Sequence, residues 1–382
     1  MDRPAGELLL KIPLEDTIAS VDISSLASQP NEDDTFSSLV QLANGQEERL
    51  ALEILRRREE NEYLTTILPS THYAVWTMPD DLWEKMATDC LPRCYRETFQ
   101  ATRDRVQDFC RRMMQAKGHV YSKDDFLWAF SMVRSRSVAV PELEPVSSSS
   151  SSNNQDFSQV PLALIPGLDL LNHHFEVGAA TQLVLVEEGD NGNKQASKKS
   201  WMVSSNEPIK AGEQVYLSYG SDKDNWKLLL TYGFAVPNNP NAVVFWSWQD
   251  LLDAANKVRP TVFQERVCQQ LLRHPQLEAY TTLSEDRASF SYNANQKQPR
   301  ESLLNGLLML ENLVTQLGQP ADDKIGQDVL HELIQQRLQD LQGCQENIQK
   351  QTQSMEDSRY KEWIPFWGAM KTAMKQEEKD LT

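Results

Sequence analysis

Three short segments that follow one another along the chain constrain its fold more than any other feature. The first is Asp169-Leu170-Leu171-Asn172-His173, the second spans residues 212–220 and the third spans 229–234. An Asn-His pair after an apolar stretch is typical of a turn or a strand end. A Tyr-Gly pair after alternating apolar residues is typical of a strand end with an interfacial aromatic ring. The three segments therefore predict short strands closed by turns.

Further strands are predicted on both sides of these segments. Residues 7–13 form an apolar run that follows Ala5-Gly6 and ends at a proline. The same Ala-Gly-Glu order recurs at 211–213, so we expect a tight turn before an edge of a small sheet at both places. Residues 182–186 and 201–204 flank a polar stretch and predict a hairpin with an extended tip.

Between about residues 35 and 129 the apolar pattern changes to a helical period. Residues 47–60 form the clearest amphipathic pattern, and we expect helices also over 80–86 and 94–117. The expected apolar face of the first helix contains Leu50, Ala51, Ile54 and Leu55, and the expected polar face contains Glu53, Arg56 and Glu60.

The serine run at 147–152 cannot bury enough apolar surface to offset the entropy of ordering, so residues 142–159 are expected to be a disordered loop. After Trp248 the pattern is helical again, with helices expected over 302–317 and 328–353. These patterns predict an α+β protein with an all-α C-terminal domain. The expected divisions are 1–34, 35–130, 131–248 and 249–382.

Charge and composition exclude some functional classes. The formal net charge is -17 and the isoelectric point is near 4.9, so a polyanion would be repelled and nonspecific nucleic-acid binding is not expected. The acidic field either attracts a basic protein segment or only maintains solubility. The chain has no apolar run of about 18 residues, which argues against a membrane span. The acidic N-terminus lacks the apolar core of a secretory signal.

Five cysteines are scattered along the chain, and we expect reduced thiols rather than a metal site or a disulfide framework. Cys90 and Cys94 are four residues apart, which is not the spacing of a zinc ribbon, and no second pair supports one.

The order of the three segments resembles the C-terminal half of a SET domain, the knotted β-fold of S-adenosylmethionine-dependent protein-lysine methyltransferases. The resemblance is strongest to the subgroup typified by the Rubisco large-subunit methyltransferase. In that subgroup a helical insert splits the SET domain, and a helical substrate-binding domain follows it. The resemblance implies a SET β-fold with a pseudoknot, a helical insert at 35–130 and a protein substrate that presents a lysine.

The resemblance also implies roles for individual residues. Tyr219 matches the catalytic tyrosine, and Tyr232 matches a second tyrosine that lines the cofactor and the lysine channel. Asn172 and His173 match the Asn-His pair at the adenine end of S-adenosylmethionine. Asp169 precedes that pair near the cofactor or substrate, and Arg136 matches an arginine that approaches the cofactor carboxylate. Taken alone, Arg134-Ser135-Arg136 is most often a solvated charged stretch.

Members of the subgroup have a Gly-rich segment, roughly Gly-x-Gly-Leu, before the strand that residues 7–13 resemble. This segment is not found in the 382 residues, so we expect either a fragment or a misplaced start, or a protein that has lost half its cofactor pocket. Two alternatives to a lysine methyltransferase stay open. One is a catalytically inactive SET-like protein-binding module, and the other is a protein-histidine methyltransferase, against which Tyr232 argues.

The resemblance predicts that residues 134–234 form one compact β-structure in which the segment carrying Asn172 lies beside the segment carrying Tyr219. The helical region after residue 248 is expected to dock a protein substrate, and a deletion after Pro260 is expected to abolish that binding. We expect a monomer that binds neither nucleic acid nor membranes. The expected location is intracellular, in the cytoplasm or the nucleus, with a plastid also open.

Overall fold

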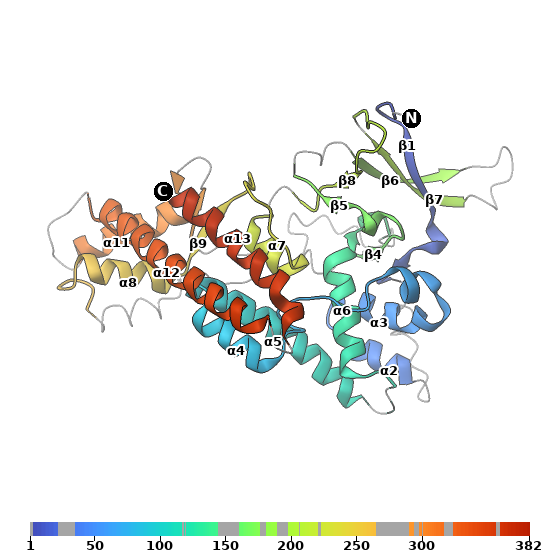
Figure 1. The fold of residues 1–382 in the computed structure, drawn as a ribbon, viewed down its shortest axis with the longest axis horizontal. Coiled ribbons are helices and arrows are strands. Elements are labelled where there is room, and N and C mark those ends of the chain that lie inside the picture. The colour runs from blue at the N-terminus through green and yellow to red at the C-terminus, as the bar shows by residue number, and fades with distance from the viewer. Residues whose placement is uncertain are drawn as a thin grey trace. The chain divides into compact units, whose positions relative to one another are not determined.

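The computed structural model describes residues 3–382 apart from 22–34, 117, 119, 144–159, 176–180, 189–197, 206, 221–222, 265–289, 294–297, 300, 317–323 and 357–359. The chain divides into two compact units (Figure 1). The first contains Met1–His72 and Arg105–Ser221, and the second contains Tyr73–Asp104 and Asp222–Thr382. The block predicted as one helical insert at 35–130 is thus shared between the units. The predicted domain divisions remain predictions.

The largest sheet of the first unit contains β1 (Leu8–Pro13), β7 (Lys198–Ser205) and β6 (Thr181–Glu188) in that order (Figure 1). Both pairings are antiparallel, and Ile12 of β1 lies opposite Trp201 of β7. The predicted first strand and the predicted hairpin are therefore confirmed. The tip of the hairpin falls mainly on residues 189–197, which lie outside the described part of the chain.

Two smaller sheets complete the β-structure described in the first unit. The first has the order β2 (Ile18–Ala19), β4 (Leu162–Leu164) and β3 (Val138–Ala139), and both pairings are antiparallel. The second is a parallel pair of β5 (Asn172–His173) and β8 (Tyr216–Leu217). The sheets share a core of buried apolar side chains, which includes Ile12, Ala19, Val140, Ala163, Ile165, Leu168, Trp201 and Val203.

The helices of the first unit are α2 (Thr35–Leu42), α3 (Gln46–Arg57) and α6 (Lys123–Arg136), with the C-terminal part of α5 (Arg93–Gln115). Helix α6 begins at a capping box in which Ser122 and Asp125 exchange hydrogen bonds with each other's backbone amides. Short helical turns are η1 (Leu14–Asp16), η2 (Arg58–Glu60), η3 (Tyr63–Ile67), η4 (Pro141–Leu143) and η7 (Leu168–Leu170). The predicted disordered loop falls mainly on residues 144–159, outside the described residues.

The predicted polar face of α3 is wrong at Glu53. Its side chain is fully buried and binds the guanidinium groups of Arg56 and Arg57. A buried carboxylate is tolerated only when it is paired and hydrogen-bonded, and the two arginines provide this. The helical period assigned Glu53 to the polar face, but the period carries no information on how deeply the helix is covered.

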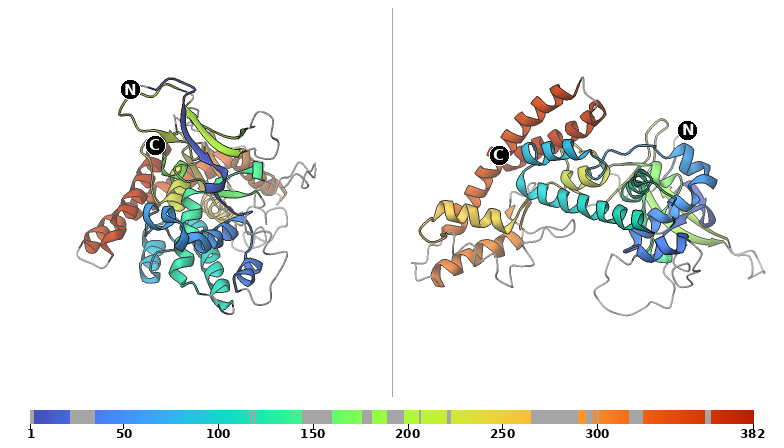
Figure 2. Two further views of the ribbon diagram at one scale, coloured as in Figure 1. Left: turned by 90° about the vertical axis from the view of Figure 1, so that its right-hand side faces the viewer. Right: turned by 90° about the horizontal axis from the view of Figure 1, so that it is seen from below.

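The second unit contains helices α4 (Asp80–Asp89), α7 (Asn225–Tyr232), α8 (Trp248–Val258), α11 (Glu301–Gln316), α12 (Ile325–Met355) and α13 (Ile364–Leu381), with the turn η8 (Lys361–Trp363). Helices α12 and α13 run side by side (Figures 1 and 2). Their core with α8 and α11 includes Trp246, Trp248, Leu251, Leu252, Leu303, Leu307, Val329 and Leu333.

The prediction of an all-α C-terminal domain is wrong. Three antiparallel strands, β9 (Val243–Trp246), β10 (Phe290–Asn293) and β11 (Gln298–Pro299), form a sheet in this unit. The two strands after Trp248 have only four and two residues, which is too short for a period of two to be recognised. Both described units therefore mix helices and strands, and the α+β class is confirmed.

Candidate active site

The parallel pair of β5 and β8 brings the first two sequence segments together. Asn172 lies opposite Tyr216, and His173 lies opposite Leu217. The segment carrying Asn172 therefore lies beside the segment carrying Tyr219, as predicted, although more than 40 residues of sequence separate them. The prediction that residues 134–234 form one β-structure is wrong at its C-terminal end. Residues 225–232 form helix α7, which belongs to the second unit.

Tyr219 follows β8 and makes two hydrogen bonds to the β5 segment. Its hydroxyl donates to the carbonyl oxygen of Leu171 at 2.8 Å, and its amide donates to Nδ1 of His173 at 3.1 Å. The rings of His173 and Tyr219 lie with centroids 5.1 Å apart. Both ends of the tyrosine are thus fixed, the hydroxyl against the Leu171 backbone and the amide against the His173 side chain. An Nδ1 acceptor requires the neutral imidazole with its proton on Nε2.

Arg136 is the last residue of α6 and reaches the turn η7 that precedes β5. Its Nη1 donates to the backbone oxygen of Asp169 at 3.0 Å and lies 3.5 Å from the carboxylate Oδ2. The Arg136 side chain is 22% exposed, whereas that of Asp169 is fully buried. The Nε atom of Arg136 is also buried and has no hydrogen-bond partner among the described residues. This arginine therefore holds Asp169 and retains a donor for another acceptor.

Tyr63 is a site residue that the sequence analysis missed. It begins the turn η3, and its hydroxyl donates to Oδ1 of Asp169, which also accepts the amide of Gly167 at 3.1 Å. The buried carboxylate thus has hydrogen bonds from a hydroxyl, an amide and a guanidinium. Tyr63 is 106 residues away from Asp169 in the sequence and lies in the predicted helical block, where no pattern distinguishes it from a packing residue.

Burial determines the protonation of these groups. It raises the pKa of Asp169, and the Tyr63 hydroxyl and Arg136 act in the opposite direction. Burial also raises the pKa of Tyr219, which keeps the phenol protonated at neutral pH. The pKa of His173 is lowered by burial, and that of His72 is lowered to about 4, again by burial and by the charge of Arg136. Both imidazoles are therefore neutral near pH 7.

The remaining predicted residues differ in their surroundings. Asn172 is exposed, so its side chain is open to a ligand. Tyr232 is the last residue of α7 and lies in the second unit, where its ring faces that of Phe234 with centroids 6.0 Å apart. Its predicted role at the cofactor remains a prediction.

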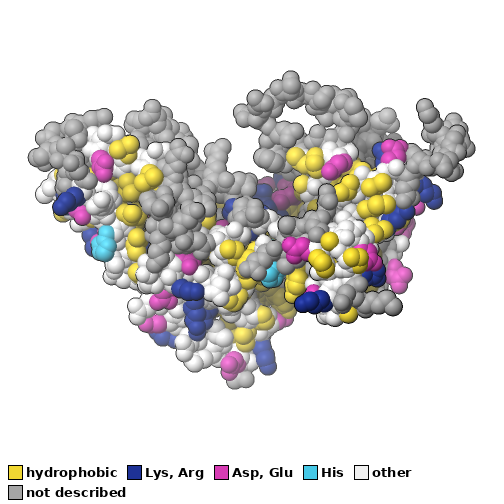
Figure 3. All heavy atoms as spheres, turned by 90° about the horizontal axis from the view of Figure 1, so that it is seen from above, with side chains coloured by type: hydrophobic (Ala, Val, Ile, Leu, Met, Phe, Trp, Pro, Cys, Tyr) yellow, Lys and Arg dark blue, Asp and Glu magenta, His cyan; other side chains and the backbone are white. Residues whose placement is uncertain are grey.

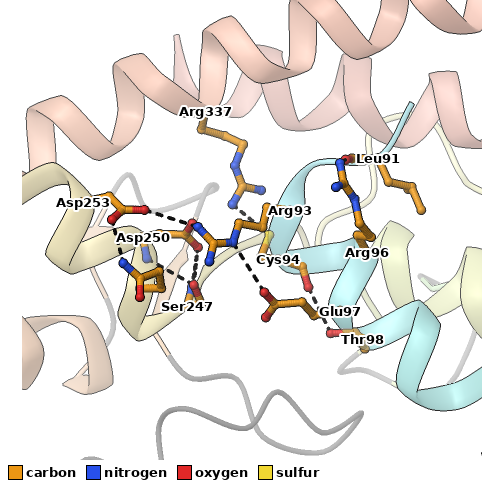
Figure 4. A network of polar contacts seen from close by, with 11 residues as sticks. Leu91, Arg93, Cys94, Arg96, Glu97, Thr98, Ser247, Asp250, Asp253 and Arg337 are labelled. Carbon is orange, nitrogen blue, oxygen red and sulfur yellow. Dashed lines mark hydrogen bonds and ion pairs between the residues drawn. The ribbon is translucent and has the colours of Figure 1, made fainter. Parts of the chain in front are cut away.

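The second unit has a separate buried polar cluster around Arg337 of α12. The guanidinium donates to Glu377 at 2.9 Å, to the backbone oxygen of Phe245 at 2.6 Å and to the thiol of Cys94 at 2.9 Å. Figure 4 shows Arg337 pointing toward Cys94, with a more exposed group around Arg93 and Asp253 nearby. The polar groups around Arg337 are hydrogen-bonded to one another, which is typical of a cluster with a structural role.

Other classes of site are not found in the described part of the chain. Its His, Cys, Asp and Glu side chains form no group of three that could bind a metal ion. Its cysteines Cys90, Cys94, Cys110 and Cys344 are free, and Cys268 lies outside the described residues. Among the described helices, none is long and apolar enough to cross a bilayer.

Acidic and basic side chains are interspersed on the face drawn in Figure 3.

Comparisons with known proteins identify relatives and structural neighbours of the chain. No family model matches the chain. SET domain-containing protein 4 of Artemia parthenogenetica is 28% identical over 187 residues, which are 48% of this chain and 42% of that protein. The chloroplastic Rubisco large-subunit N-methyltransferase of Pisum sativum is 35% identical over 119 residues, 30% of this chain and 20% of that protein. The chain thus spans less than half the length of these relatives.

The crystal structure of the SET domain of LSMT bound to lysine and AdoHcy aligns with the whole of this chain and 82% of its own, with a TM-score of 0.53 and 18% identity. The chain has the fold of that SET structure. The resemblance inferred from the sequence is confirmed by the curated relatives and by the solved structures.

Proposed function

We propose that this chain is an S-adenosylmethionine-dependent protein-lysine N-methyltransferase. The observation that carries the proposal is the hydrogen bond of 2.8 Å between the Tyr219 hydroxyl and the Leu171 carbonyl, beside the parallel pair of β5 and β8. Support also comes from the relatives, since the pea protein is named an N-methyltransferase and the LSMT structure contains lysine and AdoHcy.

Methyl transfer to a lysine requires a neutral amine that is aligned with the methyl carbon and shielded from water. Because burial raises its pKa, Tyr219 acts through a protonated hydroxyl and orients the amine rather than removing its proton as a phenolate. An entering amine finds two oxygen acceptors, the Leu171 carbonyl and the Tyr219 hydroxyl. Hydrogen bonds to both would fix the N–H directions and leave the nitrogen lone pair free for attack.

The residues around Arg136 fit the predicted cofactor. The buried Nε–H of Arg136, which has no partner among the described residues, suits a carboxylate, the group at the methionine end of S-adenosylmethionine. Exposed Asn172 and neutral His173 are proposed to contact its adenine end, and Asp169 and Tyr232 are proposed to complete the contacts. When bound, S-adenosylmethionine supplies the methyl group. The chain's own residues hold the carboxylate and orient the amine.

The decisive experiment is Tyr219→Phe, assayed by mass spectrometry of a lysine-containing protein substrate. We expect the rate of methyl transfer to fall by about two to three orders of magnitude, the size found for the loss of one positioned hydrogen-bonding group at a reacting centre. Cofactor affinity measured by calorimetry should not change, because Tyr219 is assigned to the amine. Tyr121→Phe is the matched control, since its ring packs against Phe126 in the same unit.

The outcomes separate the alternatives. Methyl groups on histidine would favour the histidine methyltransferase. Binding of a protein partner without cofactor binding or methylation would favour the inactive module. An unchanged rate in Tyr219→Phe would refute the assignment of Tyr219.

We also propose that the second unit contributes the docking surface for the protein substrate, in keeping with the predicted substrate-binding domain at 249–382. Leu304 and Leu308 lie four residues apart on α11 and are 51% and 55% exposed. Replacing both with serine should weaken substrate binding with little effect on folding, because the buried Leu303 and Leu307 are kept. Unchanged binding by this variant would exclude α11 from the interface.

The finer structural and cellular predictions are proposals as well. The parallel pairing of β5 with β8 supports the pseudoknot, which an experimental structure with bound cofactor would test. We propose a monomer that binds neither nucleic acid nor membranes and lies in the cytoplasm or nucleus, with a plastid as the alternative. Light scattering of the purified chain and microscopy of a tagged form test these points.

A further inference from the structure

The carboxylate of Asp169 links three distant parts of the first unit. Its side chain is fully buried, and its oxygens receive the hydroxyl of Tyr63 from η3, the amide of Gly167 from its own turn and Nη1 of Arg136 from α6. The backbone oxygen of the same aspartate accepts a second hydrogen bond from Arg136 at 3.0 Å. A buried carboxylate of this kind is stabilised by each donor, so removing one donor changes the others.

The turn that holds Asp169 leads directly into the candidate active site. Leu171 lies two residues further on, and its amide donates to the carbonyl of Leu168 to close η7. The carbonyl of Leu171 then accepts the Tyr219 hydroxyl, and the following residues enter the β5–β8 pair. The position of the Leu171 carbonyl therefore depends on how Asp169 is held.

We propose that Tyr63 is a positioning residue for methyl transfer, which acts through Asp169 to hold Arg136 and the Leu171 carbonyl in register with Tyr219. The inference rests on the proposed function and extends it to a residue outside the three sequence segments. Tyr63 is a positioning residue rather than a catalytic residue in this scheme, because its hydroxyl donates its proton to Asp169.

The charges around Asp169 predict the direction in which the loss of the Tyr63 hydroxyl changes the Asp169 pKa. The groups that face it are Tyr63, Arg136 and Tyr219, and His72 next to Arg136 is neutral. The Tyr63 hydroxyl opposes the rise in the Asp169 pKa that burial causes, so its removal raises that pKa further. A protonated Asp169 binds Arg136 less strongly, and a higher pH restores the carboxylate.

The test is Tyr63→Phe, which keeps the ring and removes only the hydroxyl. We expect kcat to fall by about tenfold at acidic pH, as for the loss of one hydrogen bond to a charged group, and to recover as the pH rises. The KM for the protein substrate should change little. Asp169→Asn should lower kcat without this recovery at higher pH. Adding Tyr63→Phe to Asp169→Asn should lower kcat much less than Tyr63→Phe does in the native chain.

Tyr360→Phe is the matched control, because its hydroxyl also donates to a carboxylate, that of Asp81, but at an exposed site in the second unit. It should leave kcat and its pH dependence unchanged. A Tyr63→Phe variant that loses stability and kcat equally at every pH would overturn the proposal and leave a packing role.

A spectroscopic measurement separates this proposal from the proposed function. In the chain labelled with carbon-13 at the phenol carbon of tyrosine, the Tyr219 resonance is assigned by its loss in Tyr219→Phe. Tyr63→Phe and Asp169→Asn should each shift that resonance, and Tyr360→Phe should not. This result is expected whether or not the chain methylates a substrate. A Tyr219 resonance that stays in place in both variants would refute the coupling.

Discussion

Replacing Arg337 with methionine should destabilise the second unit more than any replacement of an exposed ion pair. Arg337 and Glu377 are each only 4% exposed, and their ion pair has an N···O distance of 2.9 Å. Without the guanidinium, Glu377 keeps a hydrogen bond from Trp226 at 2.6 Å but loses its counter-charge, and the Phe245 carbonyl loses its donor. Breaking a buried pair in this way costs about 3–5 kcal/mol, and we expect about 4 kcal/mol here.

The loss should depend on pH with a definite sign. Burial raises the pKa of Glu377 even with Arg337 beside it, and removal of the cation raises it further. A protonated Glu377 no longer carries an unpaired buried charge. The difference in unfolding free energy between Arg337→Met and the native chain should therefore be largest above neutral pH and should shrink on acidification.

The assay is urea unfolding followed by tryptophan fluorescence, with the free energy extrapolated linearly to water. Trp226 donates to Glu377, so it is one of the tryptophans whose emission changes when the cluster unfolds. Adding Glu377→Gln to Arg337→Met should restore part of the loss. Lys257→Met is the control, because Lys257 is 59% exposed and its pair with Glu332 should contribute less than about 1 kcal/mol. A loss below about 1 kcal/mol for Arg337→Met would refute the reasoning, because it would mean that water reaches the pair.

Two further predictions concern the ends of helix α7. Asp224 caps the helix and is fully buried, and burial raises its pKa to about 6. Because this pKa is above the ordinary value of about 4, the native chain should lose up to about 3 kcal/mol as the pH rises from 4 to 6. Asp224→Asn keeps a capping side chain and should flatten that dependence in denaturation measured against pH, whereas an unchanged slope would mean that Asp224 is charged throughout. Gly233 ends the helix with φ 78°, and an added Cβ would lie 2.8 Å from the Tyr73 carbonyl oxygen. Gly233→Ala should therefore destabilise the chain by more than the roughly 1–2 kcal/mol that a left-handed alanine costs. Gly212→Ala, at φ 86° with open space around it, should cost only that amount when the unfolding of both variants is measured in the same way. Equal losses in the two variants would rule out the clash.

Local sequence determined the strands and helices that carry their own pattern. Several elements were predictable because a hydrophobic period and the glycines and prolines that end an element act over a few residues. They are the strand at 7–13, the hairpin strands around 182–186 and 201–204, and the long helices near 302–317 and 328–353. The resemblance of three short segments to SET domains also predicted that the Asn172 and Tyr219 segments lie together. Strands β5 and β8 pair over only two residues, which is too short for a periodic pattern, so periodicity alone did not predict that these segments lie together.

Only the tertiary structure determined the contacts between segments distant in the sequence. Tyr63 and Asp169 are 106 residues apart, and neither the helical period around Tyr63 nor the turn around Asp169 contains information about the other. Glu53 was assigned to a polar face, but the packing around α3 buries it, and the neighbouring Arg56 and Arg57 make that burial tolerable. The short strand β10 pairs with the edge of β9, and β11 pairs in turn with β10. For Tyr63 and Asp169 the fold brings the partner from a distant segment, and for Glu53 the packing around α3 determines how deeply the side chain is buried. Neither the distant partner nor the depth of burial can be read from the neighbouring residues in the chain.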